Sequence, residues 1–183
     1  LAIDTHDADG PMTIATTGEG TAYAAVVAEG VLPAADVAER DQNLIVRRKW
    51  LDRAGDPIDP MGLRVGDLVY VELTVQTTED APQQSIHNLA IVDALPGGME
   101  VENPRLATSA GGDPRLGGVY GRTQFLDDRV VLFISASRHE RTYRYALRVV
   151  TPGSFALPPV QGSCMYDASV TSVHGAGRVE VSR

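Results

Sequence analysis

The chain has 183 residues, 43% of them hydrophobic, so it has enough apolar side chains for a buried core and is not expected to be disordered. Its 16 basic and 24 acidic residues give a net charge of −8, and no basic stripe offsets that charge locally, which argues against a nucleic-acid partner. No stretch approaches the roughly 20 apolar residues that cross a bilayer, and a single cysteine cannot form an internal disulfide.

The first part of the chain differs in pattern from the rest. It begins at Leu1 rather than at a methionine, as expected of a segment of a longer protein or of a processed form. Residues 12–17 and 21–28 are predicted strands, joined by a turn at Gly18-Glu19-Gly20 whose glycines tolerate positive φ. A linker without alternation follows. The sequence therefore predicts that residues 1–40 are the last strands of a preceding domain, followed by that linker.

Residues 41–183 are predicted to form the main domain, and their dominant pattern is alternation with period two. In residues 68–75 and 141–150, alternate apolar side chains share one face, as in half-buried strands of an antiparallel sheet. Shorter candidate strands occupy residues 44–51, 88–94, 128–135 and 178–182. Several strands separated by turns, without a long helix, predict an all-β antiparallel β-sandwich of the immunoglobulin or fibronectin type.

Few residues suggest metal or nucleic-acid chemistry. The densest basic cluster, Arg47-Arg48-Lys49, is only three residues long and fits the solvated face of a strand. The acidic run at residues 4–9 lacks the downstream Glu and the flanking helices of a calcium loop. The histidines do not pair at metal-ligand spacing, so neither a metal site nor a cofactor is predicted; they are His6, His87, His139 and His174.

One segment has the residue types of a cysteine hydrolase. Gln161 and Cys164 lie close together, and His174 follows them. However, the Gln lies beside the Cys instead of in a distant loop, and no helical pattern follows that would lower the pKa of the thiol. We therefore predict that the chain is not an enzyme, and rapid alkylation of Cys164 at acidic pH would favour the alternative.

The residues after Pro158-Pro159 are expected to be exposed. Paired prolines stiffen the chain and cannot donate to a β ladder, so they are expected to present the segment Cys164–Asp167 as an extended loop. Met165 beside the amphipathic Tyr166 suits a docking surface. The same two side chains would also suit a plug at the end of the sandwich, and the residues alone leave both interpretations open.

Several sequence blocks follow one another in a characteristic order. They are Leu44–Asp52, Val65–Val69, the Asp-x-Leu-Pro-x-Gly-x-Glu block that starts at Asp93, Tyr145–Phe155, and Pro158-Pro159-Val160 followed by Met165-Tyr166-Asp167. This series, covering about residues 40–183, resembles the C-terminal macroglobulin-like domain of the bacterial alpha-2-macroglobulin family. The resemblance implies the same all-β sandwich fold.

The resemblance also implies a function for the parent protein. Family members are large exported proteins of the periplasm, often lipid-anchored to the inner membrane, that act in bacterial defence as endopeptidase inhibitors. A protease cuts a bait segment, and an internal thioester formed from a Cys-x-Glu-Gln motif captures it. Because Met165-Tyr166-Asp167 follows Cys164, that cysteine does not form the thioester, and the bait and the thioester domain are expected upstream. Residues 1–40 resemble the end of the domain that brackets the thioester domain.

By the same resemblance, Met165 and Tyr166 lie over the thioester of the parent chain and shield it from water and amines. The implied partners are that thioester domain and, through the parent, target proteases; no cofactor is implied. Cys164 departs from the small or acidic residue that often precedes the pair. The alternative is an adhesion or carbohydrate-binding sandwich with an aromatic patch such as Tyr120, Tyr143 and Tyr145, which an aromatic content of 5% disfavours.

Overall fold

The computed structural model describes residues 13, 15, 17–21, 23, 25, 36–102 and 122–183. The chain divides into two compact units, Leu1–Val31 and Leu32–Arg183. In the first unit the predicted turn is present, with φ of 109° at Gly18 and 125° at Gly20. Most of the two strands predicted beside that turn lies outside the described residues. That residues 1–40 complete a neighbouring domain stays a prediction.

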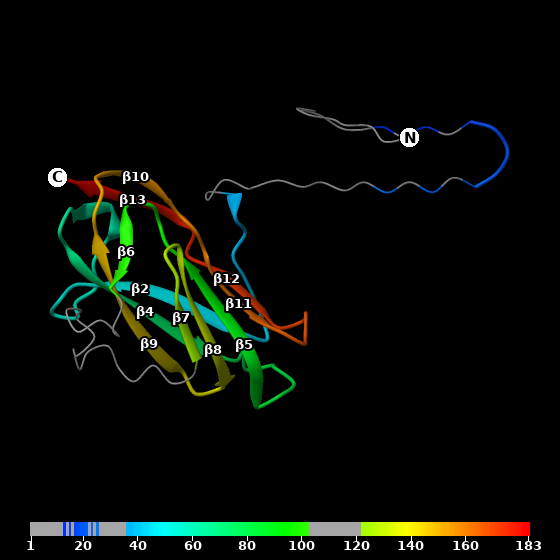
Figure 1. The fold of residues 1–183 in the computed structure, drawn as a ribbon. Helices are drawn as coiled ribbons and strands as arrows, with labels where there is room; N and C mark the ends of the chain where they lie inside the picture. Colours follow the sequence, from blue (N-terminus) through cyan, green and yellow to red (C-terminus); the bar gives the residue numbers. More distant parts are fainter. Residues whose placement is uncertain are drawn as a thin grey trace. The chain divides into compact units, whose positions relative to one another are not determined.

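The described residues of the second unit form three β-sheets, shown in Figure 1. Sheet A has the order β1 (Arg40–Gln42), β12 (Thr171–His174), β11 (Val160–Cys164), β5 (Ser85–Ala94), β8 (Arg129–Ser137) and β7 (Arg122–Phe125). Sheet B has the order β2 (Ile45–Leu51), β4 (Leu68–Gln76), β9 (Arg141–Val149) and β6 (Met99–Glu102). Sheet C has the order β10 (Gly153–Leu157), β13 (Gly177–Ser182) and β3 (Leu63–Arg64), which follows the 3-10 turn η2 (Pro60–Gly62).

Strand pairing among the described residues is antiparallel except between β13 and β3. The predicted all-β antiparallel sandwich is therefore confirmed. No helix in the described part of the chain is long and apolar enough to cross a membrane.

One hydrophobic core joins the sheets, and alternation determines which residues enter it. Val71 and Leu73 of β4 and Leu147 of β9 have no exposed surface, and Leu89 and Ile91 of β5 meet them from sheet A. Burying each side chain of this size contributes about 1.5–3 kcal/mol. The register that puts Val71 opposite Tyr145 and Leu73 opposite Tyr143 keeps both tyrosines on the same inner face.

The outer face of β4 differs from the prediction of a half-buried strand. Tyr70 is only 4% exposed and packs with Leu51 and Ala146 in a second apolar cluster, and Glu72, 9% exposed, forms an ion pair with Arg144. β4 lies between β2 and β9, and long side chains from both neighbours cover it. The prediction of a solvated outer face was wrong for this reason.

The predicted solvated face at residues 47–49 is also wrong at Arg48. This residue shares the core side of β2 with Val46 and Trp50, and its guanidinium lies 5.7 Å from the centre of the Trp50 ring. It forms an ion pair of 2.5 Å with Asp93 of β5, and the two side chains are 2% and 1% exposed. Tyr145 of β9 donates a hydrogen bond of 2.6 Å to the other Asp93 oxygen. These three residues form a polar clasp between sheets A and B.

The polar clasp also positions the chain before β11. Arg48 donates to the carbonyl oxygens of Pro158 at 2.8 Å and of Gly175 at 2.6 Å. Burial raises the pKa of Asp93, against the opposing effects of the Arg48 charge and the Tyr145 hydroxyl. Burial and the nearby Asp93 carboxylate raise the pKa of Tyr145 well above its ordinary value, so the phenol remains a donor. The entry to β11 is thus tied to the buried core.

Candidate functional site

The predicted loop is present between β11 and β12, and we call residues 165–169 the presentation loop. Its first two side chains are exposed: Met165 by 49% and Tyr166 by 83%. A plug at the end of the sandwich would be buried, and these two side chains are not. That these two side chains act as a thioester shield stays a prediction at this stage.

A turn inside the presentation loop fixes its shape. The Asp167 side chain accepts hydrogen bonds from the Ser169 backbone N–H at 2.9 Å and from the Ser169 hydroxyl at 2.6 Å. These bonds lower the pKa of the Asp167 carboxyl, which therefore stays ionised and keeps both bonds at neutral pH. The Val170 N–H donates to the Asp167 carbonyl, and the Cys164 N–H donates to the Val170 carbonyl. Such a turn is typical of Asp followed two residues later by Ser.

Two asparagines in left-handed conformation fasten the presentation loop to neighbouring strands. Asn88, with φ of 57°, lies where the β5–β8 register shifts at a β-bulge, and its carbonyl accepts the Met165 N–H at 3.0 Å. Asn43, with φ of 58°, donates from its amide to the Ser169 carbonyl at 3.1 Å. Asn tolerates this conformation better than most residues. Both ends of the loop are therefore held, while Met165 and Tyr166 project from it.

A pocket of about 430 Å³ lies next to the presentation loop, and Met165 forms part of its wall. We call it the loop-side pocket; its other lining residues are His87, Asn88, Phe133, Ile134, Ser135, Arg141 and Tyr143. The His87 Nδ1 and the Ser135 hydroxyl are 2.9 Å apart. The pocket thus combines an apolar floor with polar groups, next to the exposed pair.

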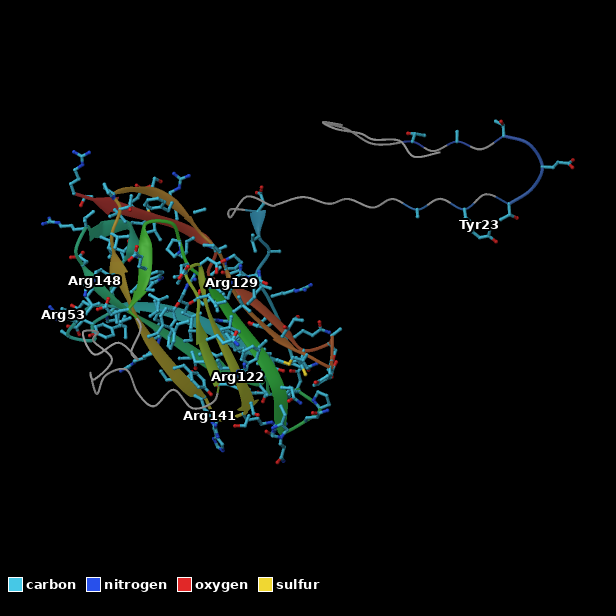
Figure 2. All side chains as sticks on the ribbon, in the orientation of Figure 1. Tyr23, Arg53, Arg122, Arg129, Arg141 and Arg148 are labelled. Atoms are coloured by element: carbon cyan, nitrogen blue, oxygen red, sulfur yellow. The ribbon has the colours of Figure 1, made fainter. Side chains whose placement is uncertain are left out.

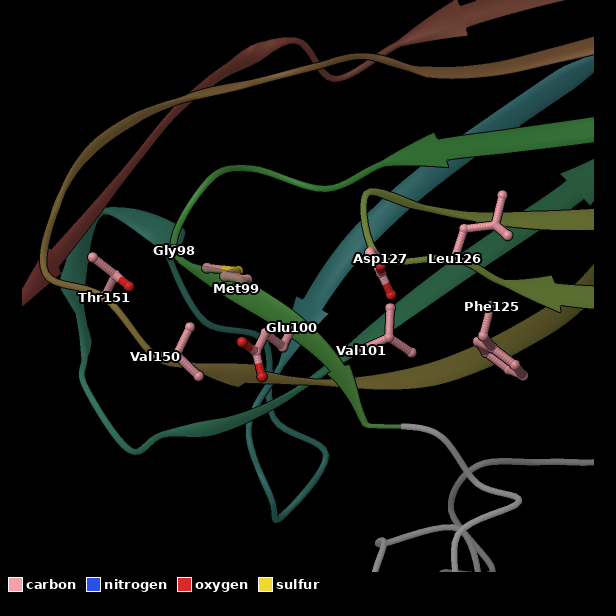
Figure 3. A pocket seen from close by; sticks show the side chains of 9 residues that line it. All are labelled: Gly98, Met99, Glu100, Val101, Phe125, Leu126, Asp127, Val150 and Thr151. Carbon is pink, nitrogen blue, oxygen red and sulfur yellow. The ribbon is translucent and has the colours of Figure 1, made fainter.

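A second pocket, of about 590 Å³, lies at β6 and the β7–β8 turn (Figure 3). It has an apolar wall and two carboxylates, from Glu100 and Asp127. In the described ranges, no group of three or more His, Cys, Asp or Glu side chains gathers as metal ligands would. We assign this second pocket no chemistry.

The residues of the cysteine-hydrolase alternative do not come together. His174 pairs with Val160 in the β11–β12 ladder, four residues from Cys164, which corresponds to about 13 Å along the strand. His174 instead lies 3.2 Å from the Glu39 carboxylate, and the Cys164 thiol lies 3.5 Å from the His87 carbonyl as a weak donor. Cys164 and His174 are therefore not poised for nucleophilic chemistry.

The aromatic patch expected of a carbohydrate-binding module does not form on the described surface. Tyr143 and Tyr145 are 3% and 4% exposed because they face the core, and Tyr120 lies outside the described residues. A sugar ring cannot stack on buried tyrosines. This observation disfavours the adhesion or carbohydrate-binding alternative.

Sequence reasoning found the exposed pair but missed most of what surrounds it. The Asp167-to-Ser169 spacing is a turn signal that would have located the bend. The Asn43 and Asn88 contacts carry no local signal, since the Asn43–Ser169 bond joins residues 126 positions apart. The alternation of Val46, Arg48 and Trp50 is a signal that would have placed Arg48 on the core side, against the predicted solvated face.

Comparisons with known proteins agree with the fold. The model of the Bacterial Alpha-2-macroglobulin MG10 domain matches residues 44–168. The chain is 30% identical over 175 residues to an alpha-2-macroglobulin of Xylella fastidiosa strain Temecula1, covering 88% of this chain and 10% of that protein. It thus spans about a tenth of the length of this relative.

Solved structures of bacterial alpha-2-macroglobulins are also similar to this chain. The crystal structure of trypsin-activated alpha-2-macroglobulin from Escherichia coli matches with a TM-score of 0.70 and 28% identity, over 79% of this chain and 11% of that chain. Salmonella alpha-2-macroglobulin reacted with methylamine matches with a TM-score of 0.68 and 28% identity, over 80% of this chain and 10% of that chain. This chain therefore belongs to the bacterial alpha-2-macroglobulin MG10 domain family.

Proposed function

We propose that this chain is the C-terminal domain of an alpha-2-macroglobulin-like endopeptidase inhibitor and has no catalytic activity of its own. It packs on the thioester domain of the same parent chain, where Met165 and Tyr166 cover the thioester. The observation that carries the proposal is a pair of large exposed side chains on a loop held at both ends. The parent's partners are then target proteases, and its place is the periplasm, with a lipid anchor to the inner membrane.

The chemistry of a thioester explains why such a cover would matter. The bond survives only where water and amines are kept away, and a thioether chain beside a phenol ring would exclude both. Burying each of the two side chains is worth about 1.5–3 kcal/mol. A contact of that size is strong enough to hold in the resting protein, and a conformational change after bait cleavage can break it.

Two comparisons support the proposal. The Salmonella relative is known as a methylamine-reacted protein, and methylamine is an amine nucleophile of the kind that a cover would exclude. The Escherichia coli relative is known in a trypsin-activated form. The sequence of this chain contains no Cys-x-Glu-Gln motif, so the proposal places the thioester in another part of the parent.

The test uses the full-length natural protein that contains this chain. Methylamine incorporation and thiol release are followed by mass spectrometry in wild type, Met165→Ala and Tyr166→Ala. Matched controls are Met61→Ala and Tyr23→Ala, which remove side chains exposed by 48% and 95% elsewhere; Tyr23 is labelled in Figure 2. Each shield variant is expected to lose about 1.5 kcal/mol of protection, or roughly tenfold in rate.

Equal rates in all five proteins would refute the shield. A parent without any methylamine-reactive thioester would refute it as well, and would leave the domain with a structural role.

A further inference from the structure

The loop-side pocket is lined by residues of β5 and β8 from sheet A and of β9 from sheet B, together with Met165. In the β4–β9 register Val75 pairs with Arg141 and Leu73 with Tyr143, so Arg141 lies on the inner side of sheet B, opposite the core residue Val75. From sheet A, His87 at the β5 bulge and Ser135 of β8 line the same pocket. Anything that covers Met165 therefore also meets the mouth of this pocket.

The charged group in the pocket wall is the Arg141 guanidinium. It forms no ion pair within the described part of the chain. Further along β9, Arg144 pairs with Glu72 and Arg148 with Glu102, whereas Arg141 pairs with no carboxylate. Arg122 lies nearby, with its guanidinium 6.0 Å from the ring centre of Phe133, another lining residue. Figure 2 labels both arginines.

Carboxylates also occur in the loops after β4, β8 and β11, but none of them lines the pocket. They are Glu79, Asp80, Glu140 and Asp167. Of these, Asp167 is bonded to Ser169. The lining of the pocket therefore carries the positive charge of Arg141 and no carboxylate, on a chain whose net charge is −8.

The His87–Ser135 pair adds a hydrogen-bond donor whichever tautomer is present. If the His87 Nδ1 carries the proton it donates to the Ser135 oxygen, and the Ser135 hydroxyl hydrogen is then free to donate elsewhere. If Ser135 donates to Nδ1, the His87 Nε2 carries the free proton. Together with the Arg141 guanidinium, the pocket offers donors to an acceptor, and a carboxylate is the acceptor that best suits a guanidinium.

We propose that the loop-side pocket receives an Asp or Glu side chain of the thioester-bearing domain, as a second anchor beside Met165 and Tyr166. This inference rests on the proposed function, because the shield contact brings that domain to the pocket. The net negative charge of the chain repels an acidic surface elsewhere, so the basic pocket also sets the orientation of docking. Loss of the anchor loosens the cover without removing it.

The test compares Arg141→Glu, Arg141→Lys and Arg53→Glu in the full-length protein, with the methylamine readout. Arg53 is the matched control, because it follows Leu51 at the Tyr70 end of β4, whereas Arg141 lies at the Val75 end. We expect Arg141→Glu to react about fivefold faster than wild type, Arg141→Lys to react at a rate between those two, and Arg53→Glu to match wild type.

A second measurement varies the salt concentration. Raising NaCl from about 0.1 M to about 1 M shortens the screening length from about 10 Å to about 3 Å. It should accelerate wild type, where salt screens an attraction, and slow Arg141→Glu, where salt screens the repulsion between two carboxylates.

The outcomes separate the two proposals. If Tyr166→Ala reacts faster while Arg141→Glu behaves like Arg53→Glu, the carboxylate anchor is wrong and the shield stands. If neither Tyr166→Ala nor Arg141→Glu changes the rate, both are wrong. If Arg141→Glu accelerates the reaction but wild type and variant respond equally to salt, the contact is not with a charged group, and the carboxylate is overturned.

Discussion

Arg48 and Asp93 place opposite charges in the core between the two main sheets, where the exposed fractions are only 2% and 1%. A buried pair of this kind adds little net stability compared with apolar residues of the same size, because both charges must lose their water. Removing one partner is different, since the other charge then remains buried without compensation. The polar clasp also fixes which carbonyl groups the Arg48 guanidinium holds, and so fixes the entry to β11.

At this scale we predict that Asp93→Asn destabilises the domain by about 3–5 kcal/mol, because it leaves Arg48 buried without a carboxylate. Tyr145→Phe removes one hydrogen bond to the same carboxylate and should cost about 1.5–3 kcal/mol. Urea denaturation followed by Trp50 fluorescence gives both free energies of unfolding. A smaller loss in Asp93→Asn than in Tyr145→Phe would contradict the ion-pair interpretation.

Among the elements, the connection from β5 to β6 is packed around Phe155 of β10. A Cβ on Gly98, whose φ is +78°, would lie 2.7 Å from the Phe155 ring and 2.8 Å from the Thr151 carbonyl. Gly55 has a similar φ of +92°, but a Cβ there would meet nothing within 4 Å. Substitution at Gly55 therefore tests backbone strain alone, whereas substitution at Gly98 tests backbone strain together with overpacking.

Gly55→Ala is expected to destabilise the domain by about 1–2 kcal/mol from left-handed strain alone. Gly98→Ala carries the same strain and a further loss of about 1–3 kcal/mol, because the Phe155 ring must move. Differential scanning calorimetry of both variants measures the difference in melting temperature. Equal losses would show that the contact with Phe155 relaxes freely.

The elements also show what sequence patterns can and cannot predict. Residues 68–75 and 141–150 were predicted as strands because apolar side chains recur on one face, and they form β4 (Leu68–Gln76) and β9 (Arg141–Val149). β11 escaped this reasoning, since Gly162 stands where a Cβ would lie 2.8 Å from the Leu44 and Val46 side chains. A strand whose inner position must be empty gives no apolar alternation.

The candidate site also has one part that the sequence predicts and one part that it does not. The prolines Pro158-Pro159 and the family resemblance predicted that Met165 and Tyr166 are exposed. Their exposure could be predicted because it depends on the residues next to them in the sequence. The loop-side pocket could not be predicted in this way, because β5, β8 and β9 supply its walls and only their packing brings them together.

For the molecule as a whole, the fastening of β1 matters, because β1 is the first strand of the second unit and forms one edge of sheet A. Asp41 forms an ion pair with Arg47 at 2.5 Å and accepts a hydrogen bond from Ser172 of β12 at 2.8 Å. The bond from Arg47 lowers the pKa of the Asp41 carboxyl from its ordinary value. A carboxyl whose pKa falls on folding stabilises the folded state above its unfolded pKa, and the contribution is lost as the pH drops through the folded value.

We therefore predict that Asp41→Asn is less stable than wild type at neutral pH, and that the difference shrinks below about pH 4. Arg47→Met should flatten the same part of the profile, because it removes the main cause of the shift. Melting temperatures measured from pH 7 to pH 2.5 test this. A constant difference across that range would mean that Asp41 acts through its shape and not its charge.

The bonds that hold the presentation loop have a consequence for the history of this domain. Besides the backbone groups of Cys164, Met165 and Val170, they involve Asn43, Asn88, Asp167 and Ser169, and none uses the side chains of residues 165 and 166. Lineages can therefore exchange these two side chains without rebuilding the sandwich. Sequence drift at these positions would record changes in the surface that the loop meets, and the loop is also a natural place to graft a foreign binding motif.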